Sequence, residues 1–362
     1  MNYRDHLRYF VICGIVFVLI YFVTAIKPLN KEFFLQTESL IYLNNEEQTA
    51  DSTDGSFNAG ENKAYPFRLK EYAGYFTESG KIIFARKIPF KATLSDSLWA
   101  FYDNNSESIE IKNIDGSIAS IIRSAGFPFL QDNRIYLLPP GGNSISEYTL
   151  SGARSWIYES YTPVTAFNSS SKGAVIGFAD GALVCLTPDG KERFAFYPGG
   201  STNEIILGTD ISETEDMTAC ISGINNQRFV LTTFDSSKHK VVFHEYLNSD
   251  LHERALVQFS KDSSHVFYRY NGGLGIVDCK KLKSIHIPLK GAVVQIEELE
   301  NQNLTLVLSR GDGEFFIYLL ENSSKLVGSF SFEAQSAFIT ATSDGFFVGH
   351  DTTISKLNVE RN

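Results

Sequence analysis

Short apolar runs of strand length recur along residues 81–360, and most of them end in turns that contain glycine. Sets of three or four runs repeat about every 40 residues, with hardly any pattern of helical period between them. The Asp180-Gly181 turn is typical, because a tight hairpin needs the positive φ that glycine adopts freely. A repeat of this length predicts a β-propeller, in which each set folds into one four-stranded antiparallel blade around a central axis.

The blades can be placed along the chain when strands a to d are counted from the axis outward. The best-marked set has its four strands at Val164–Phe167, Ala174–Phe178, Ala182–Leu186 and Arg193–Phe196. Seven sets fall at residues 98–122, 135–158, 164–196, 204–245, 255–287, 292–329 and 337–357. We therefore predict an all-β fold, a seven-bladed β-propeller.

The two ends of the repeat region are incomplete in complementary ways. The last set, residues 337–357, supplies only three strands, whereas Gly80–Phe84 resembles an outer strand with no inner strands before it. An open ring would expose unpaired strand edges, which proteins normally pair or cover. We therefore predict that Lys81–Ala85 pairs with Thr353–Leu357, so that N- and C-terminal strands close the propeller.

Ahead of the repeats lies one apolar run without charge, residues 9–26, framed by Arg8 and Lys27. As a helix it would be about 27 Å long at 1.5 Å per residue, close to the thickness of the hydrocarbon core of a bilayer. We predict an uncleaved transmembrane signal-anchor helix. A cleavable signal peptide is the alternative, because Val23 and Ala25 would permit cleavage after Ala25.

The predicted organisation has four parts. These are a short cytoplasmic tail (residues 1–8), the transmembrane helix (9–26), a partly disordered linker (27–65) and the propeller (66–362). The linker is inferred from residues 44–63, which contain almost no apolar side chain. A short tail, one span and a large body are the usual signal-anchor layout, so we expect the propeller on the extracytoplasmic, periplasmic side of a membrane.

Charge and cysteine usage limit the classes of partner and of crosslink. The chain has a formal net charge of −10, and an acidic body repels phosphates, so no nucleic acid is expected as a partner. Cys185, Cys220 and Cys279 lie in or beside strand-like runs, and none belongs to a CxxC pair. We expect buried free thiols, and leave open a single disulfide between Cys185 and Cys220.

One set carries a repeat signature, namely Gly181-x-Leu183-x-x-Leu186-x-x-Asp189-Gly190-Lys-Glu-x-Phe194. It resembles the quinoprotein-type propeller repeat, which ends in an acidic turn, Gly, Lys and an aromatic residue. Residues 272–278 are similar to a WD-repeat strand, although no Trp-Asp dipeptide occurs. Quinoprotein dehydrogenases hold their quinone and calcium against a vicinal Cys-Cys disulfide, and this chain has no adjacent cysteines, so the cofactor is not carried over. The resemblance extends to the propeller scaffold of outer-membrane β-barrel assembly, which is extracytoplasmic and non-catalytic.

No catalytic, cofactor-binding or metal-binding residue stands out. Five histidines crowd into two of the predicted blades, without the spacing of metal ligands on one strand face: His239, His244, His252, His265 and His286. The tripeptide Arg310-Gly311-Asp312 falls in a predicted b–c turn, where turn chemistry alone explains it. The chain contains no GxSxG or HExxH motif. We therefore expect no enzymatic activity and no cofactor.

Two functions remain. The first is a membrane-tethered, non-catalytic propeller that acts as a scaffold for protein partners outside the cytoplasm. The alternative is an enzyme or small-ligand binder that uses the axial funnel. An enzyme should place convergent polar side chains on the a-strand entry loops, around Ser95–Ser97, Asn168–Ser171, Thr209–Ser212 and Lys261–Ser264.

Overall fold

The structure is a computed structural model, and it describes residues 11–21, 33–43, 48–49, 63–103, 106–236 and 238–361. The chain divides into two compact units. One unit comprises residues 1–35 and 359–362, and the other comprises residues 36–358.

The first unit contains a helix over residues 11–21. In the described part of the chain, no helix combines the length and the apolar character needed to cross a membrane. This finding corrects both the predicted transmembrane helix of residues 9–26 and the single-pass membrane location inferred from it. The apolar run has the composition of a span, but the described helix uses 11 of its residues, about 16 Å against a hydrocarbon core of roughly 30 Å. Residues 1–10 and 22–32 lie outside the described residues.

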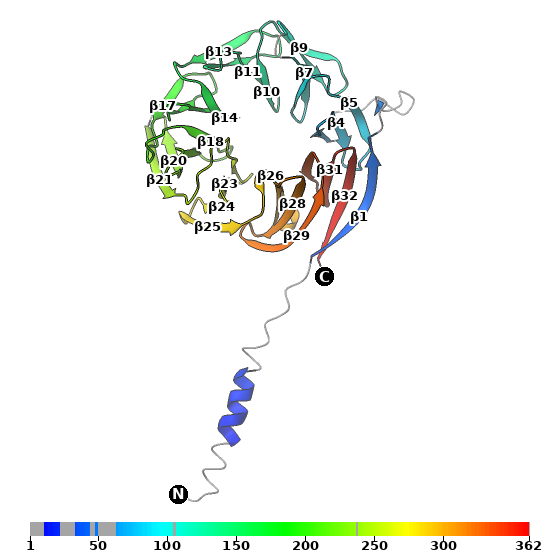
Figure 1. Ribbon diagram of the computed structural model, residues 1–362, viewed down its shortest axis with the longest axis vertical. Helices are drawn as coiled ribbons and strands as arrows, with labels where there is room; N and C mark the ends of the chain where they lie inside the picture. The colour runs from blue at the N-terminus through cyan, green and yellow to red at the C-terminus, as the bar shows by residue number, and fades with distance from the viewer. Residues whose placement is uncertain are drawn as a thin grey trace, which may run out of the picture. The chain divides into compact units, whose positions relative to one another are not determined.

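The second unit is a ring of eight four-stranded antiparallel sheets, each of which is one blade (Figure 1). From the axis outward, blade 1 contains β3 (Ala64–Arg68), β4 (Tyr72–Thr77), β5 (Ile82–Lys87) and β2 (Gln48–Thr49); blade 2 contains β6 (Lys91–Leu94), β7 (Leu98–Tyr102), β8 (Ile109–Asn113) and β9 (Ile118–Ile122); blade 3 contains β10 (Phe127–Gln131), β11 (Arg134–Leu138), β12 (Ser144–Tyr148) and β13 (Arg154–Glu159); blade 4 contains β14 (Val164–Ser170), β15 (Gly173–Phe178), β16 (Leu183–Leu186) and β17 (Glu192–Phe196).

The other four blades follow in the same order. Blade 5 contains β18 (Ile206–Ile211), β19 (Met217–Ser222), β20 (Arg228–Asp235) and β21 (Lys238–Tyr246); blade 6 contains β22 (Val257–Phe259), β23 (His265–Tyr270), β24 (Gly273–Asp278) and β25 (Lys283–Pro288); blade 7 contains β26 (Ala292–Leu299), the short 3-10 helix η1 (Glu300–Gln302), β27 (Leu304–Arg310), β28 (Glu314–Glu321) and β29 (Lys325–Glu333); blade 8 contains β30 (Ala337–Ala341), β31 (Gly345–His350), β32 (Thr353–Arg361) and β1 (Phe33–Tyr42).

The prediction of seven blades is therefore wrong by one, and the additional blade is blade 1. Its strands β3 and β4 escaped the sequence analysis because Pro66 and Gly74 belong to residue types that are depleted in strands. Gly74 is needed where it stands, because a Cβ there would collide with the carbonyl oxygen of Phe84 in β5. β5 is accordingly the third strand of blade 1, where Phe84 pairs with Tyr75 of β4 and with Thr49 of β2.

The predicted pairing of Lys81–Ala85 with Thr353–Leu357 is also wrong, because β5 is the third strand of blade 1 and pairs with β4 and β2. N- and C-terminal strands do complete one blade, but the N-terminal partner is β1, which lies beside β32 as the outer strand of blade 8. The residues of β1 fall within the predicted linker of residues 27–65. Lys356 Nζ of β32 forms an ion pair with Glu38 Oε2 of β1 at 2.8 Å, and its side chain is 6% exposed. An outer strand thus covers the edge that the last blade would otherwise expose.

Blade 1 also differs from the other blades in the direction of its inner strand. The Lys70 N–H, just after β3, donates to Ser336 Oγ, just before β30, at 3.0 Å. β3 therefore runs opposite to the neighbouring inner strand. Elsewhere the inner strands run in the same direction, as the bond from Gln131 Nε2 at the end of β10 to Ser169 O near the end of β14 indicates (2.6 Å).

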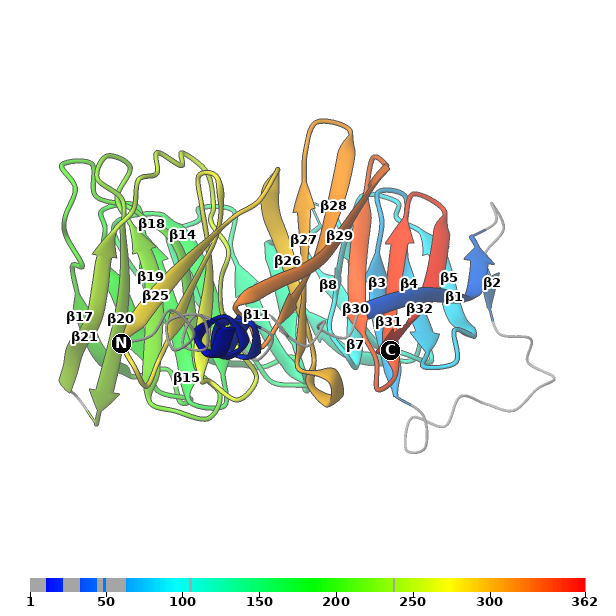
Figure 2. The ribbon, with the colours of Figure 1, turned by 90° about the horizontal axis from the view of Figure 1, so that it is seen from below.

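The ring has two faces, seen edge-on in Figure 2. We call one the a–b face, because strand a turns into strand b there in blades 2 to 8; the c–d turns and the β4–β5 turn of blade 1 share it. We call the other the b–c face. It holds the b–c turns, the connections from each outer strand to the next blade, and the β3–β4 turn of blade 1.

The hydrophobic core lies mainly between neighbouring blades. Cys185 of blade 4 and Cys220 of blade 5, for example, are buried in one apolar cluster. Both are free thiols, as is Cys279, so the disulfide left open by the sequence is not formed. Burial raises the pKa of each of these thiols to about 12. The cysteines therefore pack as small apolar side chains.

Candidate functional site

The polar loops of the a–b face join each blade to the next. At each of the eight junctions, at least one hydrogen bond joins the two neighbouring blades near this face. In order from the junction of blades 1 and 2, they run from Tyr75 Oη to Ser95 O (2.7 Å), Ser95 Oγ to Asp132 O (2.7 Å), Arg134 Nη1 to Ser170 O (2.6 Å), Ser170 Oγ to Ser212 O (3.0 Å), Ser212 Oγ to Ser263 Oγ (2.6 Å), the Lys261 N–H to Glu298 Oε2 (2.7 Å), Asn301 Nδ2 to Ser343 O (3.0 Å) and the Ser343 N–H to Glu78 Oε1 (3.1 Å).

Asp210 near the end of β18 is the most deeply buried acid of these junctions. Its Oδ1 accepts hydrogen bonds from Asn168 Nδ2 (2.7 Å) and the Ile211 N–H (2.8 Å), and its Oδ2 accepts one from the Phe259 N–H (2.6 Å). Burial raises the pKa of Asp210 to about 7, although the two backbone N–H donors act in the opposite direction. This carboxyl links blades 4, 5 and 6 and is enclosed by protein.

The loops singled out for an axial active site are the same loops that tie the blades. Those around Ser95–Ser97, Asn168–Ser171, Thr209–Ser212 and Lys261–Ser264 all contribute donors or acceptors to the junctions. Their serine, asparagine and aspartate side chains are thus placed by blade–blade contacts. The arrangement accounts for their polarity in structural terms.

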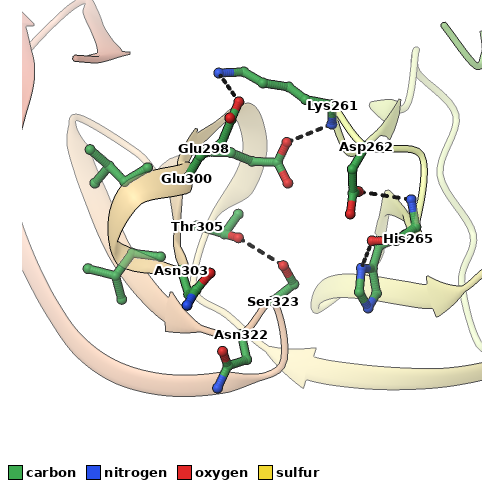
Figure 3. A pocket seen from close by; sticks show the side chains of 12 residues that line it. Lys261, Asp262, His265, Glu298, Glu300, Asn303, Thr305, Asn322 and Ser323 are labelled. Carbon is green, nitrogen blue, oxygen red and sulfur yellow. Dashed lines mark hydrogen bonds and ion pairs between the residues drawn. The ribbon is translucent and has the colours of Figure 1, made fainter. Parts of the chain in front are cut away.

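A polar hollow of about 630 Å³ lies on the a–b face between blades 6 and 7 (Figure 3). The loop after β22 forms one wall, and the end of β26 with η1 forms the other. Lys261 Nζ lies 3.1 Å from Glu300 Oε1, while the Lys261 N–H donates to Glu298. Burial raises the pKa of Glu298, partly offset by that N–H. Burial also acts on Asp262, but hydrogen bonds from Ser264 and Ser260 hold its pKa below the usual value.

The hollow contains a pair that a hydrolase could use, Ser264 Oγ and His265 Nδ1, which are 2.8 Å apart. An activated serine needs a base that a third group orients through its other nitrogen. In the described structure no hydrogen bond reaches His265 Nε2. The Ser264 N–H is bonded instead to Asp262 Oδ1 at 2.9 Å. The pair therefore does not form a triad, and it fits an ordinary loop contact.

The other singled-out histidines are spread over separate contacts. His239 stacks on Phe194 and Phe196, with ring centroids 4.9 and 4.4 Å apart. His286 Nε2 lies 2.9 Å from Tyr268 Oη. Across the described residues, no group of three or more His, Cys, Asp or Glu side chains is placed to hold a metal ion.

Exposed aromatic residues gather on the opposite face. Within the described part of residues 36–358, the exposed Phe and Tyr side chains are Tyr42, Phe90, Phe127, Tyr161, Tyr197 and Tyr246. All six lie at the b–c face, whereas Phe34, which is also exposed, lies at the start of β1, the other end of the strand from Tyr42. Phe90, Tyr161 and Tyr197 lie in connections to the next blade, Tyr246 ends the outer strand β21, and Phe127 begins the inner strand β10. Tyr42 belongs with them, because the N–H of the next residue donates to Thr352 O in the b–c turn of blade 8 (2.8 Å).

This group of aromatics was not predicted from the sequence, although the sequence contains part of the signal. Tyr161 stands in Ser-Tyr-Thr-Pro and Tyr197 in Tyr-Pro-Gly-Gly, which are turn sequences with one large aromatic residue. A Tyr in such a connection cannot be packed within a strand. The shared face became visible only when the strand order was known.

Comparisons with known proteins agree on the fold. A family model described as beta-propeller protein matches residues 1–361. An uncharacterized protein of Treponema pallidum (strain Nichols) is 33% identical over 294 residues, which cover 81% of this chain and 78% of that protein. The crystal structure of BamB from Moraxella catarrhalis matches with a TM-score of 0.60 at 12% identity, over 90% of this chain and all of that one. Sqt1 of Saccharomyces cerevisiae matches with a TM-score of 0.55 at 11% identity, over 71% of this chain and 79% of that one. At such identities the two structural matches concern the fold alone.

Proposed function

Because this chain belongs to the β-propeller protein family, we propose that it is a non-catalytic scaffold that binds protein partners through its b–c face. One observation carries the proposal, namely that six of the seven exposed Phe and Tyr side chains of the described blades lie on this face, Phe34 of β1 being the exception. Tyr161 is fully exposed and Phe90 is 71% exposed. Aromatic side chains are enriched in the cores of protein interfaces and dominate their binding energy.

The arrangement of the a–b face supports the same proposal. Its serine, asparagine and aspartate side chains bond neighbouring blades, so the ring is held rigid without any contribution from a ligand. A rigid support is what a docking surface needs, since little conformational entropy is lost when a partner binds. The fold-level likeness to BamB agrees with a scaffold, but it does not identify a partner.

Site-specific photo-crosslinking in cells tests the proposal. A photoreactive amino acid is placed at Tyr161 or Tyr197 on the b–c face, and at Leu150 on the a–b face as the matched control, since Leu150 is 50% exposed. We expect both b–c positions to give adducts with the same partner, identified by mass spectrometry, and Leu150 to give none. Adducts from Leu150 alone, or no adduct at either b–c position, would refute the proposed face.

A further inference from the structure

A second hollow, of about 460 Å³, lies inside the ring toward the b–c face. The inner strands β18, β22 and β26 and the b–c ends of β23 and β27 contribute to its wall. Figure 1 shows β18 and β26 among the strands nearest the centre of the ring. Hollows of a few hundred Å³ are of the size that takes a small ligand or a few side chains of a partner.

Three arginines line this hollow against one acid. Arg269 is 12% exposed and is paired with Glu253, with Nη2 and Oε1 2.5 Å apart. Arg254 and Arg310 form no ion pair among the described residues, and Arg254 Nη2 reaches only the Phe167 carbonyl oxygen, at 3.4 Å. Three positive charges less one negative charge leave +2 in a chain whose net charge is −10. Asp312, in the turn after Arg310, is not part of the lining.

The surroundings of Arg254 make an anionic partner favourable. Its side chain remains exposed to the solvent of the hollow. Nevertheless, the protein around it removes enough water to lower the pKa of its guanidinium. A cation that has lost part of its hydration and has no counter-ion is stabilised by an anion, and a guanidinium matches the two oxygens of a carboxylate.

The rest of the wall favours a carboxylate carried on an aliphatic stem. Leu256, Val257, Val293 and Val294 line the hollow, and Val294 is 39% exposed. A glutamate side chain has this combination of an apolar stem and an anionic end. Charged groups at an interface also steer association and set specificity, in addition to the energy of individual contacts.

We propose that this arginine-lined hollow receives carboxylate side chains from an acidic segment of the protein partner, a role that rests on the proposed function. Arg254 and Arg310 bind the carboxylates, Arg269 is held in place by Glu253, and the aliphatic wall contacts the stems. The exposed aromatics of the same face then contact the remainder of the partner. The hollow sets which partner binds, because a basic or neutral segment would leave Arg254 and Arg310 without an ion-pair partner.

The binding test uses the full chain and a fluorescein-labelled acidic probe peptide, Glu-Leu-Glu-Leu-Glu with blocked ends. Fluorescence anisotropy gives its Kd for the wild type, for Arg254→Gln and for Arg123→Gln. Arg123 is a matched control, since it is an exposed arginine in a connection of the same face and does not line the hollow. We expect Arg254→Gln to raise the Kd at least tenfold, which corresponds to about 1.4 kcal/mol, and Arg123→Gln to change it less than twofold. Equal weakening by both variants, or no binding by the wild type, would overturn the hollow as the site.

A variant that gains affinity distinguishes a specific effect on the hollow from unfolding of the protein. Glu253→Gln removes the one acid from the lining, so it should tighten binding of the probe peptide about threefold or more, whereas a damaged fold would only weaken it. Competition with glutarate separates a free organic acid from a peptide. If glutarate binds as tightly as the peptide, the hollow is a small-ligand site and the assignment to a partner protein is wrong. Loss of probe binding in all of these assays, with crosslinks still found at Tyr161 and Tyr197, would reject the hollow and leave the proposed scaffold standing.

Discussion

The two faces of the ring use similar loops for different purposes. On the a–b face, loops rich in Ser, Asp and Asn bond from blade to blade around the whole circle. On the b–c face, the connections present exposed aromatic side chains, and three arginines line a hollow inside the ring toward the same face. Polarity is therefore a poor guide to function in this fold, because the polar face is largely occupied by structural contacts. The difference leads to opposite expectations: substitutions on the a–b face should change stability, and substitutions on the b–c face should change binding.

The largest expected effect is at Asp210, the carboxyl that links three blades. Asp210→Ala leaves Asn168 Nδ2 and the N–H groups of Ile211 and Phe259 without their acceptor. Each buried unsatisfied group costs about 1–3 kcal/mol, so the free energy of unfolding should fall by about 3 kcal/mol or more. Urea unfolding at pH 6 measures it. Glu204→Ala, at an exposed position of the b–c face, is the control and should stay within about 0.5 kcal/mol of the wild type. A similar loss in both variants would remove the distinction between the faces.

The pH dependence of stability should be the next largest effect and comes from the same residue. The pKa of Asp210 is raised to about 7 in the folded ring, against about 3.9 in the unfolded chain. The folded state therefore binds the proton of the Asp210 carboxyl more tightly than the unfolded chain does. The stability that this proton provides is complete below about pH 4 and is lost as the pH rises through 7.

Comparison with a variant that cannot titrate isolates this contribution. The free energy of unfolding of the wild type minus that of Asp210→Asn should fall between pH 4.5 and 7, by at most about 1.4 kcal/mol per pH unit, and level off above pH 8. Burial also raises the pKa of Glu297, but that residue is present in both proteins and cancels in the difference. A difference that does not vary with pH would mean that Asp210 is ionised throughout, and that its three donors outweigh its burial.

The sequence was most informative where each strand, turn and blade repeats the same local pattern. The four strands of blade 4 were predicted within a few residues, because alternating apolar runs and Asp-Gly turns are both local signals. Blade 1 was missed because Pro66 and Gly74 weaken the strand signals of β3 and β4, and because residues 50–63 separate its outer strand β2 from its other three strands. The apolar run of residues 9–26 predicted a membrane span from its composition, whereas no helix of the described residues is long and apolar enough to cross a membrane.

The candidate sites also differ in how far the sequence alone could reveal them. Ser95–Ser97 and the other a-strand loops could be found from sequence, but only the blade junctions explain why they are polar. Arg254 lies in the connection before β22, Arg269 in β23 and Arg310 at the end of β27, so no regular spacing in the sequence relates them. The aromatics are similar, since a single Tyr in a connection means little until several are seen to share one face.

The smallest expected change in stability, and the clearest separation of the two faces, is at Tyr161. Its side chain is fully exposed in the connection between β13 and β14, so Tyr161→Ser removes almost no buried surface. The free energy of unfolding should change by less than about 0.5 kcal/mol. Binding should suffer much more, because truncating an aromatic residue at the centre of an interface commonly costs about 2 kcal/mol or more. With the photoreactive amino acid kept at Tyr197, the yield of crosslinked partner should therefore fall at least tenfold in Tyr161→Ser. Leu150→Ser, a truncation at a half-exposed position of the a–b face, should leave that yield unchanged. If the two substitutions reduce the yield equally, the partner contacts both faces and the b–c face is not the docking surface.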